Sequence, residues 1–246
     1  MTKKGQAQGS SDSSGIKYVV PKIDEFMNKF RDVKAMGFVQ SLRRGPTGIG
    51  QTFNELMGLP EDNLAKPDID GAEIKTHRAN SGSMITLFTF DQKAWKMPPL
   101  EAINQYGSLD RNGRRGLYYT MSRTPNSAGL FLYIMDDEVS VRHISGRVIV
   151  AWNLDSIVDR FQKKFPSLLF VSAYSEGRDG IEYFHYYRVQ LMKGTSPELL
   201  AEQFRAENIL VDLRLHDNGT MARNHGTGFR TLEDKLPLLF SSIEDL

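Results

Sequence analysis

Apolar residues recur at helical spacing in four stretches of the chain. In residues 20–36 they return every three or four positions, the period that places them on one face of an amphipathic helix. The same period predicts shorter helices over residues 49–57, 155–164 and 196–205. A serine followed by a proline begins the last stretch, which is typical of a helix N-cap and first helical residue.

Six further stretches have the alternating or continuous apolar pattern of β-strands. They span residues 72–77, 84–90, 130–135, 168–173, 183–192 and 210–215. The run 84–90 is apolar almost throughout, which predicts a central strand buried on both faces. Strands alternate with helices without a regular period, so the pattern predicts a mixed α/β fold.

The composition is that of a globular protein long enough for one large domain or two lobes. The chain has 246 residues, of which 40% are hydrophobic and 25% charged. No apolar run reaches the length of a transmembrane helix, so we expect no membrane contact. Residues 1–15 are polar and Gly/Ser-rich, which predicts a disordered tail rather than a signal peptide. The chain has no cysteine and therefore no disulfides or thiolate metal sites, which favours a cytoplasmic location.

The net charge of +1 does not by itself indicate a nucleic-acid partner, because non-specific binders are usually far more basic. Basic residues do cluster locally, at Arg43 and Arg44 and again in residues 111–115. Such clusters fit phosphate contacts, and they equally fit an ordinary solvated surface.

The residues with the clearest chemical potential are Asp68, Glu73 and Lys75. Side chains alternate faces along a strand, so Glu73 and Lys75 share one face, and Asp68 can return to the same edge through the Asp70-Gly71 turn. Two carboxylates, together with a backbone carbonyl such as that of Ile74, can hold Mg²⁺. A lysine beside a phosphate stabilises developing negative charge, so the set suits phosphodiester hydrolysis. An E-x-K triplet also occurs as a plain surface pair on an edge strand.

Two other kinds of site fit the sequence less well. The segment GPTGIGQT, residues 45–52, is one residue away from a phosphate-binding P-loop, but Gln51 stands where the lysine belongs. The residues before it are too polar for the buried strand that a P-loop follows. The five histidines form no pair at metal-ligand spacing on a helix, which argues against a histidine-based nuclease.

Several segments, in the same order along the chain, carry a more specific resemblance. They are GPTGIGQTFNELM (45–57), PDIDGAEIKTH (67–77), ITLFTF (85–90), QYGSLDRNG (105–113), VDLRL (211–215) and NHGTGFR (224–230). Together they resemble the PD-(D/E)XK nuclease superfamily and, within it, the MvaI/BcnI restriction endonucleases and their mismatch-repair relative MutH. The resemblance implies a restriction-endonuclease-like α/β core with a mixed sheet and two lobes. We expect a catalytic lobe from residues 16–95 plus 148–175, and a DNA-recognition lobe from residues 96–147 plus 176–246.

The resemblance also implies roles for individual catalytic residues. Asp68 and Glu73 match the metal-binding carboxylates of the family, and Lys75 matches its catalytic lysine. The family places a further glutamate on the helix after the glycine-rich turn, where this sequence has Asn54, with Glu55 beside it. The apolar residues of that helix put Asn54 on the flank of its buried face and Glu55 nearly opposite. Asn54 can offer a carbonyl oxygen or bind a metal-bound water, so the number of metal ions is open.

Base reading is expected from the C-terminal third of the chain. Asp212 and Arg214 share a face of the strand 210–215, and the two side-chain types suit cytosine and guanine edges. A salt-bridged surface pair would look the same in sequence. His225 and Arg230 in NHGTGFR add further donors, and His77 can approach the DNA backbone. The family resemblance implies a CC-x-GG target, whose central base the sequence does not specify.

The leading hypothesis is a Mg²⁺-dependent type II restriction endonuclease that cuts double-stranded DNA as a monomer. A cognate DNA methyltransferase is then expected in the same system. A MutH-like nicking enzyme that acts through a partner is an alternative. A catalytically inactive DNA-binding relative is another, suggested by Asn54.

Overall fold

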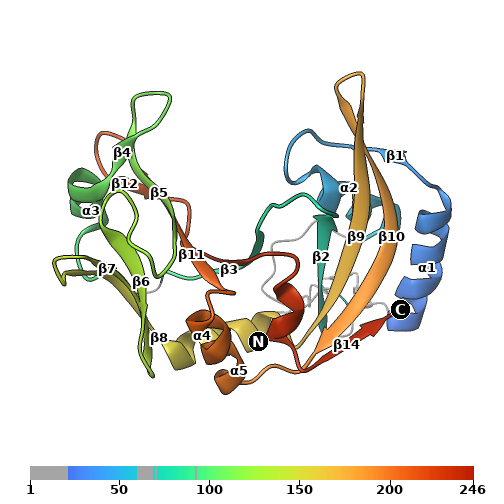
Figure 1. Ribbon diagram of the computed structural model, residues 1–246. Helices are drawn as coiled ribbons and strands as arrows, with labels where there is room; N and C mark the ends of the chain where they lie inside the picture. The colour runs from blue at the N-terminus through green and yellow to red at the C-terminus, as the bar shows by residue number, and fades with distance from the viewer. Residues whose placement is uncertain (1–21, 60–68, 70, 92) are drawn as a thin grey trace, which may run out of the picture.

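The structure, a computed structural model, describes residues 22–59, 69, 71–91 and 93–246. The predicted tail over residues 1–15, Asp68 and the Asp70 position of the predicted turn lie outside the described residues. Most of the helices and strands that the sequence predicts are present, and the strands belong to three sheets (Figure 1).

The first sheet contains the E-x-K strand and has two helices on one face. Its strands are β1 (Val39–Gln40), β10 (Ile181–Lys193), β9 (Ser167–Arg178) and β2 (Ala72–Arg78), in that order, with β14 (Ser242–Asp245) paired to β10. The helices α1 (Ile23–Ala35) and α2 (Gly48–Met57) cover it. The buried stripe of α1, which includes Phe26 and Phe30, packs on Phe53 of α2 with ring centroids 6.1 and 6.4 Å apart. This contact fixes α2 beside β2.

The strand β2 lies at the edge of this sheet and runs parallel to β9. Glu73 is in register with Leu168, and Lys75 with Phe170. Alternation along β9 divides its side chains between two cores, with Leu169 on the side of α1 and α2, and Leu168 and Phe170 on the opposite side. Glu73 and Lys75 therefore face away from α1 and α2.

The remaining strands form two sheets in the other half of the molecule. One sheet contains β3 (Ile85–Thr89), β13 (Gly228–Thr231), β11 (Leu210–Asp217), β5 (Arg115–Met121) and β4 (Ser108–Leu109), in that order, with β12 (Ala222–Asn224) paired to β11. The other contains β6 (Leu130–Ile134), β7 (Glu138–His143) and β8 (Val148–Asn153). Both contribute to one large core, which extends to the outer face of β9 through Leu168 and Phe170.

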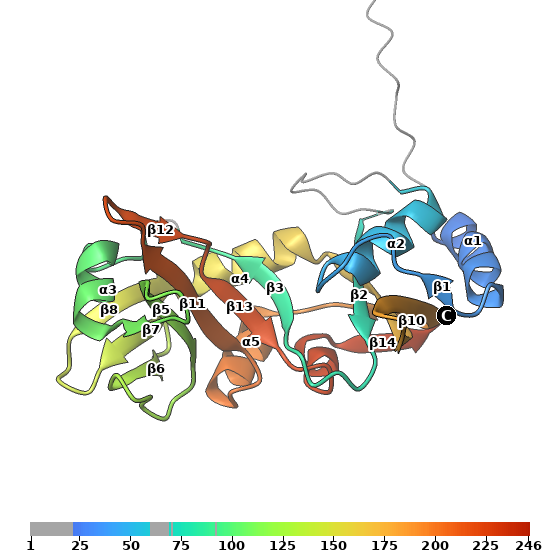
Figure 2. The ribbon, with the colours of Figure 1, turned by 90° about the horizontal axis from the view of Figure 1, so that it is seen from above.

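Helices join the two halves at their base. These are α4 (Leu154–Lys164), α5 (Pro197–Arg205) and the 3₁₀-helix η1 (Leu236–Leu239). The helix α3 (Pro99–Tyr106) instead packs on β5 and β11, within the half that contains them. In Figure 1 the half with the E-x-K sheet and the half with the other two sheets stand apart above α4 and α5. Figure 2 shows α4, β3 and β13 running between these two halves. Phe161 of α4 contacts Phe88 of β3 in an edge-on arrangement, with ring centroids 6.2 Å apart. The C-terminal end of α4 leads directly into β9, next to β2.

Several predicted elements differ from the structure. The run 84–90 is not a central strand, because β3 lies at the edge of its sheet and pairs with β13. Among the described residues it has a strand neighbour along one edge only, and its apolar side chains are buried by α4 and the rest of the large core. Residues 92–146 contain more regular structure than the single predicted strand, namely α3, β4, β5 and β7.

Sheet membership also divides the chain differently from the expected lobe ranges. The strand β10 falls within the expected recognition range 176–246, but it pairs with β9 in the sheet that contains the E-x-K strand. Conversely, β3 and β8 fall within the expected catalytic range and belong to the sheets of the other half. The long hairpin of β9 and β10 explains the first difference, because a tight turn keeps both strands in one sheet.

Candidate active site

Glu73 and Lys75 lie side by side on one face of β2, as the alternation predicts. The Nζ atom of Lys75 is 3.6 Å from Oε1 of Glu73 and 5.6 Å from the centre of the Phe165 ring. Glu73 is buried, with 5% of its surface exposed, and Lys75 is half-buried. A buried carboxylate that keeps its charge needs a cation close by, and the arrangement provides one on the same strand.

A second lysine approaches Glu73 from the end of α4. The Nζ atom of Lys164 is 2.8 Å from Oε2 of Glu73. Lys164 and Phe165 are neighbours at the C-terminal end of α4. The first places its ammonium at the Glu73 carboxylate, and the second places its ring against the Lys75 ammonium. Glu73 is flanked by two ammonium groups, one on each carboxylate oxygen.

The donor chemistry at Glu73 fits a hard divalent cation. Carboxylate and carbonyl oxygens are the ligands that Mg²⁺ prefers, and Glu73 with the Ile74 carbonyl supplies both kinds. Oε2 of Glu73 is buried and accepts no hydrogen bond of normal geometry from the described residues, so this oxygen retains acceptor capacity. Within the described ranges, no three acidic or histidine side chains lie close enough to hold a metal together. Asp68, the expected second carboxylate, is outside those ranges.

The helix α2 presents Asn54 and Glu55 as the sequence predicts. Asn54 is half-buried and Glu55 is exposed, which agrees with their places on the flank and the far side of the apolar stripe. Among the described residues, Glu55 joins Glu73 in no group of three acidic or histidine side chains that could hold a metal. Gly50 faces β2, where an added Cβ would be 3.4 Å from Oγ1 of Thr76, so the helix and the E-x-K strand approach closely.

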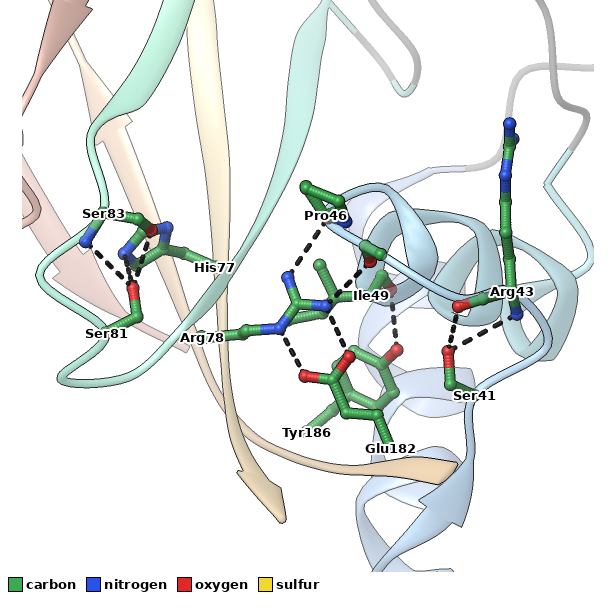
Figure 3. A network of polar contacts seen from close by, with 11 residues as sticks. Ser41, Arg43, Pro46, Ile49, His77, Arg78, Ser81, Ser83, Glu182 and Tyr186 are labelled. Atoms are coloured by element: carbon green, nitrogen blue, oxygen red, sulfur yellow. Dashed lines mark hydrogen bonds and ion pairs between the residues drawn. The ribbon is translucent and has the colours of Figure 1, made fainter. Parts of the chain in front are cut away.

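The glycine-rich turn before α2 is tied to β2 by Arg78, as Figure 3 shows. The Arg78 guanidinium makes two bonds to the carboxylate of Glu182, of 2.6 and 2.8 Å. It also donates to the carbonyls of Pro46 and Gly45, at 3.1 and 3.2 Å. The hydroxyl of Tyr186, on β10, donates to the carbonyl of Ile49 in α2 at 2.7 Å. Burial raises the pKa of this hydroxyl. The turn is therefore held in one position relative to the E-x-K strand.

A cavity of about 510 Å³ connects this strand to the other half of the molecule. Lys75 and His77 of β2 line it, together with Pro46 of the glycine-rich turn and Arg230 of β13. The site that contains Lys75 is thus continuous with the polar face of the sheet that β11 and β13 form.

Asp212 and Arg230 form a buried ion pair on that face. Nη1 of Arg230 is 2.5 Å from Oδ2 of Asp212, and Nη2 donates to the carbonyl of Met84 at 2.8 Å. The other oxygen of Asp212 accepts a bond of 2.7 Å from the hydroxyl of Thr120. The Nε–H of Arg230 is buried with no hydrogen-bond acceptor among the described residues. Both oxygens of Asp212 are therefore engaged within the protein, and Arg230 is fixed in the cavity wall.

Arg214 and His225 lie farther along the same face. Nη2 of Arg214 donates to the carbonyl of Gly226 at 3.4 Å, while its Nε is buried without an acceptor among the described residues. The rings of His225 and His216 are stacked at 5.3 Å, and Nδ1 of His216 is 2.8 Å from the hydroxyl of Tyr118. Partial burial, with help from neighbouring cations, lowers the pKa of His225. This face thus presents arginine and histidine donors in a row.

His77 occupies a buried position on the E-x-K strand. Its Nε2 is 3.3 Å from Oγ of Ser81 and 3.7 Å from a carboxylate oxygen of Glu233, and its ring stacks on Phe170. Burial lowers the pKa of His77, with Arg78 acting in the same direction and Glu233 against it. The side chain lines the cavity as an uncharged polar group around neutral pH.

Arg43 and Arg44 are exposed on the loop that leads into α2. They line a second cavity, of about 470 Å³, together with the tip of the β9–β10 hairpin at residues 180–182. The backbone N–H and carbonyl of Arg43 both bond to the Ser41 hydroxyl, at 3.4 and 2.7 Å, which leaves the guanidinium directed outward (Figure 3). These positions suit contacts to a phosphate backbone.

Fold and site together are those of a restriction-endonuclease-like nuclease. A sequence model of the MvaI/BcnI restriction endonuclease family matches residues 27–240, so the chain belongs to this family. A structure described as a complex of restriction endonuclease MvaI with cognate DNA substrate is similar over 89% of this chain and 95% of that chain, with 27% identity and a TM-score of 0.74. MvaI in the absence of DNA is similar over 94% and 99%, with 25% identity and a TM-score of 0.52. A comparison with curated proteins gives no match.

Three residues of the site are not among those predicted from sequence. Lys164 pairs with Glu73 from an element far away along the chain, and no local pattern signals such a contact. Arg78 continues the strand beyond the predicted triad, but its bonds to Glu182 depend on the fold. His216 could have been found, because it lies two residues after Arg214 on the same face of one strand.

None of the described helices combines the length and the apolar character needed to cross a membrane.

Proposed function

We propose that this chain is a type II restriction endonuclease that hydrolyses double-stranded DNA at a short specific sequence, with Mg²⁺ as its cofactor. One observation carries the proposal. Lys75, which shares a strand face with Glu73, lines the same cavity as Arg230 of the opposite sheet. A lysine suited to hydrolysis and an arginine suited to base reading thus line one cavity. Membership of the restriction endonuclease family supports the same conclusion.

In this proposal Glu73, the Ile74 carbonyl and Asp68 hold the metal. A metal ion held by these groups would supply Lewis-acid chemistry to the scissile phosphate and to the attacking water. Lys75 places its ammonium beside the phosphate and stabilises the negative charge that develops there. Asn54 contributes a neutral amide where the family has a carboxylate, so we propose that Asp68 and Glu73 supply the charge at the metal.

Base reading is assigned to the polar face of β11 and β13. Arg230 lines the cavity beside Lys75, Arg214 lies on the same face of the sheet, and arginine pairs best with the O6 and N7 atoms of guanine. Because Asp212 is bonded to Thr120 and Arg230, we propose that it acts chiefly by orienting Arg230. A CC-x-GG target fits these guanine-reading groups and the family. His225 and His77 then add donors, and Arg43 and Arg44 contact phosphates.

The proposed function also implies a DNA ligand and a methyltransferase in the same system. MvaI has been solved with cognate DNA, and we propose double-stranded DNA as the ligand of this chain. We further propose that the enzyme acts as a cytoplasmic monomer whose host DNA is protected by a cognate methyltransferase.

Run-off sequencing of plasmid DNA, incubated with the protein and Mg²⁺, tests the proposal most fully. We expect discrete double-strand breaks at one short sequence, and no cleavage after EDTA removes the metal. Nicks in one strand would favour the MutH-like alternative. A gel shift without any cleavage would favour the inactive DNA-binding alternative, and either result would refute the type II assignment.

A further inference from the structure

Glu73 has a cation on each of its oxygens, and the two cations come from different elements. Lys75 approaches Oε1 at 3.6 Å from the same strand, whereas Lys164 approaches Oε2 at 2.8 Å from the last turn of α4. The shorter contact is therefore made by the residue that the proposed hydrolysis does not use. Among the described residues, Glu73 is the one carboxylate within ion-pair distance of Lys164.

The carboxylate of Glu73 needs such a partner when no metal is present. Its side chain is 7% exposed, and a carboxylate buried to this degree is unfavourable unless a cation or hydrogen bonds compensate it. Oε2 accepts no hydrogen bond of normal geometry from the described residues. The Lys164 ammonium is thus the main compensation that this oxygen has within the described structure.

We infer that Lys164 is a resident counter-ion that holds the Glu73 carboxylate in place before metal binding, and that a divalent cation displaces it. The inference rests on the proposed function, since it takes Glu73 as a metal ligand. In this role Lys164 is a positioning residue, because it acts on the reaction through Glu73.

Competition follows from the geometry at Oε2. Mg²⁺ binds carboxylate oxygens at about 2.0–2.1 Å, so an ammonium 2.8 Å from the same oxygen would face a divalent charge at very short range. Lysine can respond to this repulsion, because its ammonium is carried on a flexible four-carbon chain. The Lys164 side chain is 25% exposed, which gives the displaced ammonium a route to solvent.

The neighbouring lysine provides a matched control. Lys163 lies one position earlier in α4, is 71% exposed and pairs with Asp159 in the same helix at 2.7 Å. Lys163→Met removes the same charge from the same helix turn without touching Glu73. Any change that Lys164→Met causes and Lys163→Met does not cause is then specific to the Glu73 contact.

The test is Mn²⁺ binding to the full-length protein without DNA, measured by the EPR signal of free Mn²⁺. The proteins compared are wild type, Lys164→Met, Lys163→Met, Lys164→Arg and Glu73→Gln. We expect Lys164→Met to bind Mn²⁺ about 3–10-fold more tightly than wild type, because a competing ion pair is removed. Lys163→Met and Lys164→Arg should remain close to wild type. Thermal unfolding in EDTA should show a lower Tm for Lys164→Met, and Mn²⁺ should raise this Tm by more than it raises that of wild type.

Each outcome decides between the two proposals. If wild type binds Mn²⁺ through Glu73 but Lys164→Met binds it equally well or more weakly, the counter-ion role is wrong and the metal assignment stands. If Glu73→Gln binds Mn²⁺ as well as wild type does, the metal assignment itself fails, and the role of Lys164 fails with it.

Discussion

The ion pair between Asp212 and Arg230 gives a prediction whose magnitude can be worked from the structure. Asp212→Asn removes the charge while keeping the shape of the side chain. The pair is short, at 2.5 Å, and the two side chains are 8% and 24% exposed. Breaking a fully buried pair costs about 3–5 kcal/mol, and the partial exposure of Arg230 reduces this to about 2–3 kcal/mol. For a chain of this length the expected fall in Tm is roughly 4–12 °C.

The same substitution should also weaken sequence discrimination. Asp212 orients Arg230 in the cavity wall, and a bidentate arginine contact to guanine contributes about 1–3 kcal/mol of discrimination. We therefore expect the ratio of cognate to non-cognate DNA affinity to fall by about tenfold, measured by titration in Ca²⁺ at fixed salt.

Two controls make the reasoning refutable. Asp159→Asn removes an exposed pair with Lys163 and should change the free energy of unfolding by no more than about 1 kcal/mol. In a double-mutant cycle, Asp212→Asn with Arg230→Met should be less destabilising than the sum of the single changes. If Arg230→Met abolishes discrimination but Asp212→Asn leaves it at the wild-type level, Asp212 does not orient Arg230 for base reading.

Three further predictions concern the glycine-rich turn, the core and pH. Gly48→Ala would bring a Cβ into the carbonyl of Arg43, so we expect weaker DNA binding in a gel-shift titration. Gly177→Ala meets no atom within 4 Å at an ordinary φ and should change binding little. Phe53→Ala removes a fully buried ring that packs on α1 and should lower the free energy of unfolding by about 3–5 kcal/mol in urea denaturation. Burial lowers the pKa of His77 below its ordinary value of 6.5, so the unfolded state binds more protons and stability falls as the pH decreases below about 6.5. His77→Gln should lose less stability between pH 7.5 and 5.5 than wild type does, and an equal loss would contradict this account.

Local periodicity predicted the elements whose own sequence determines their structure. The helix α5 begins as expected, with the Ser196 hydroxyl accepting a bond from the Leu199 N–H at 3.1 Å. The alternation along β2 correctly placed Glu73 and Lys75 on one face, because strand periodicity is a local property. The restriction-endonuclease-like fold and the MvaI/BcnI family are confirmed by the comparisons.

Features that depend on distant contacts were not predictable in this way. The run 84–90 has the composition of a central strand, but it lies at a sheet edge, and α4 packs on its apolar side chains. The pairing of Asp212 with Arg230 and of Lys164 with Glu73 depends on strand order and on where α4 ends. Sheet membership also crosses the expected lobe boundary, since the hairpin of β9 and β10 keeps residues on both sides of position 176 in one sheet, and the division into lobes stays a prediction.

The central claim is that Lys75, beside Glu73, carries out hydrolysis of DNA. Its most direct test compares the rates at which wild type, Lys75→Ala and Lys34→Ala cleave plasmid DNA in Mg²⁺, with DNA binding measured separately in Ca²⁺. Lys34 is an exposed lysine on α1 and serves as the control. We predict that Lys75→Ala binds DNA but cleaves it at least ~10²-fold more slowly, while Lys34→Ala matches wild type. Cleavage by Lys75→Ala at the wild-type rate would contradict the assignment of the active site.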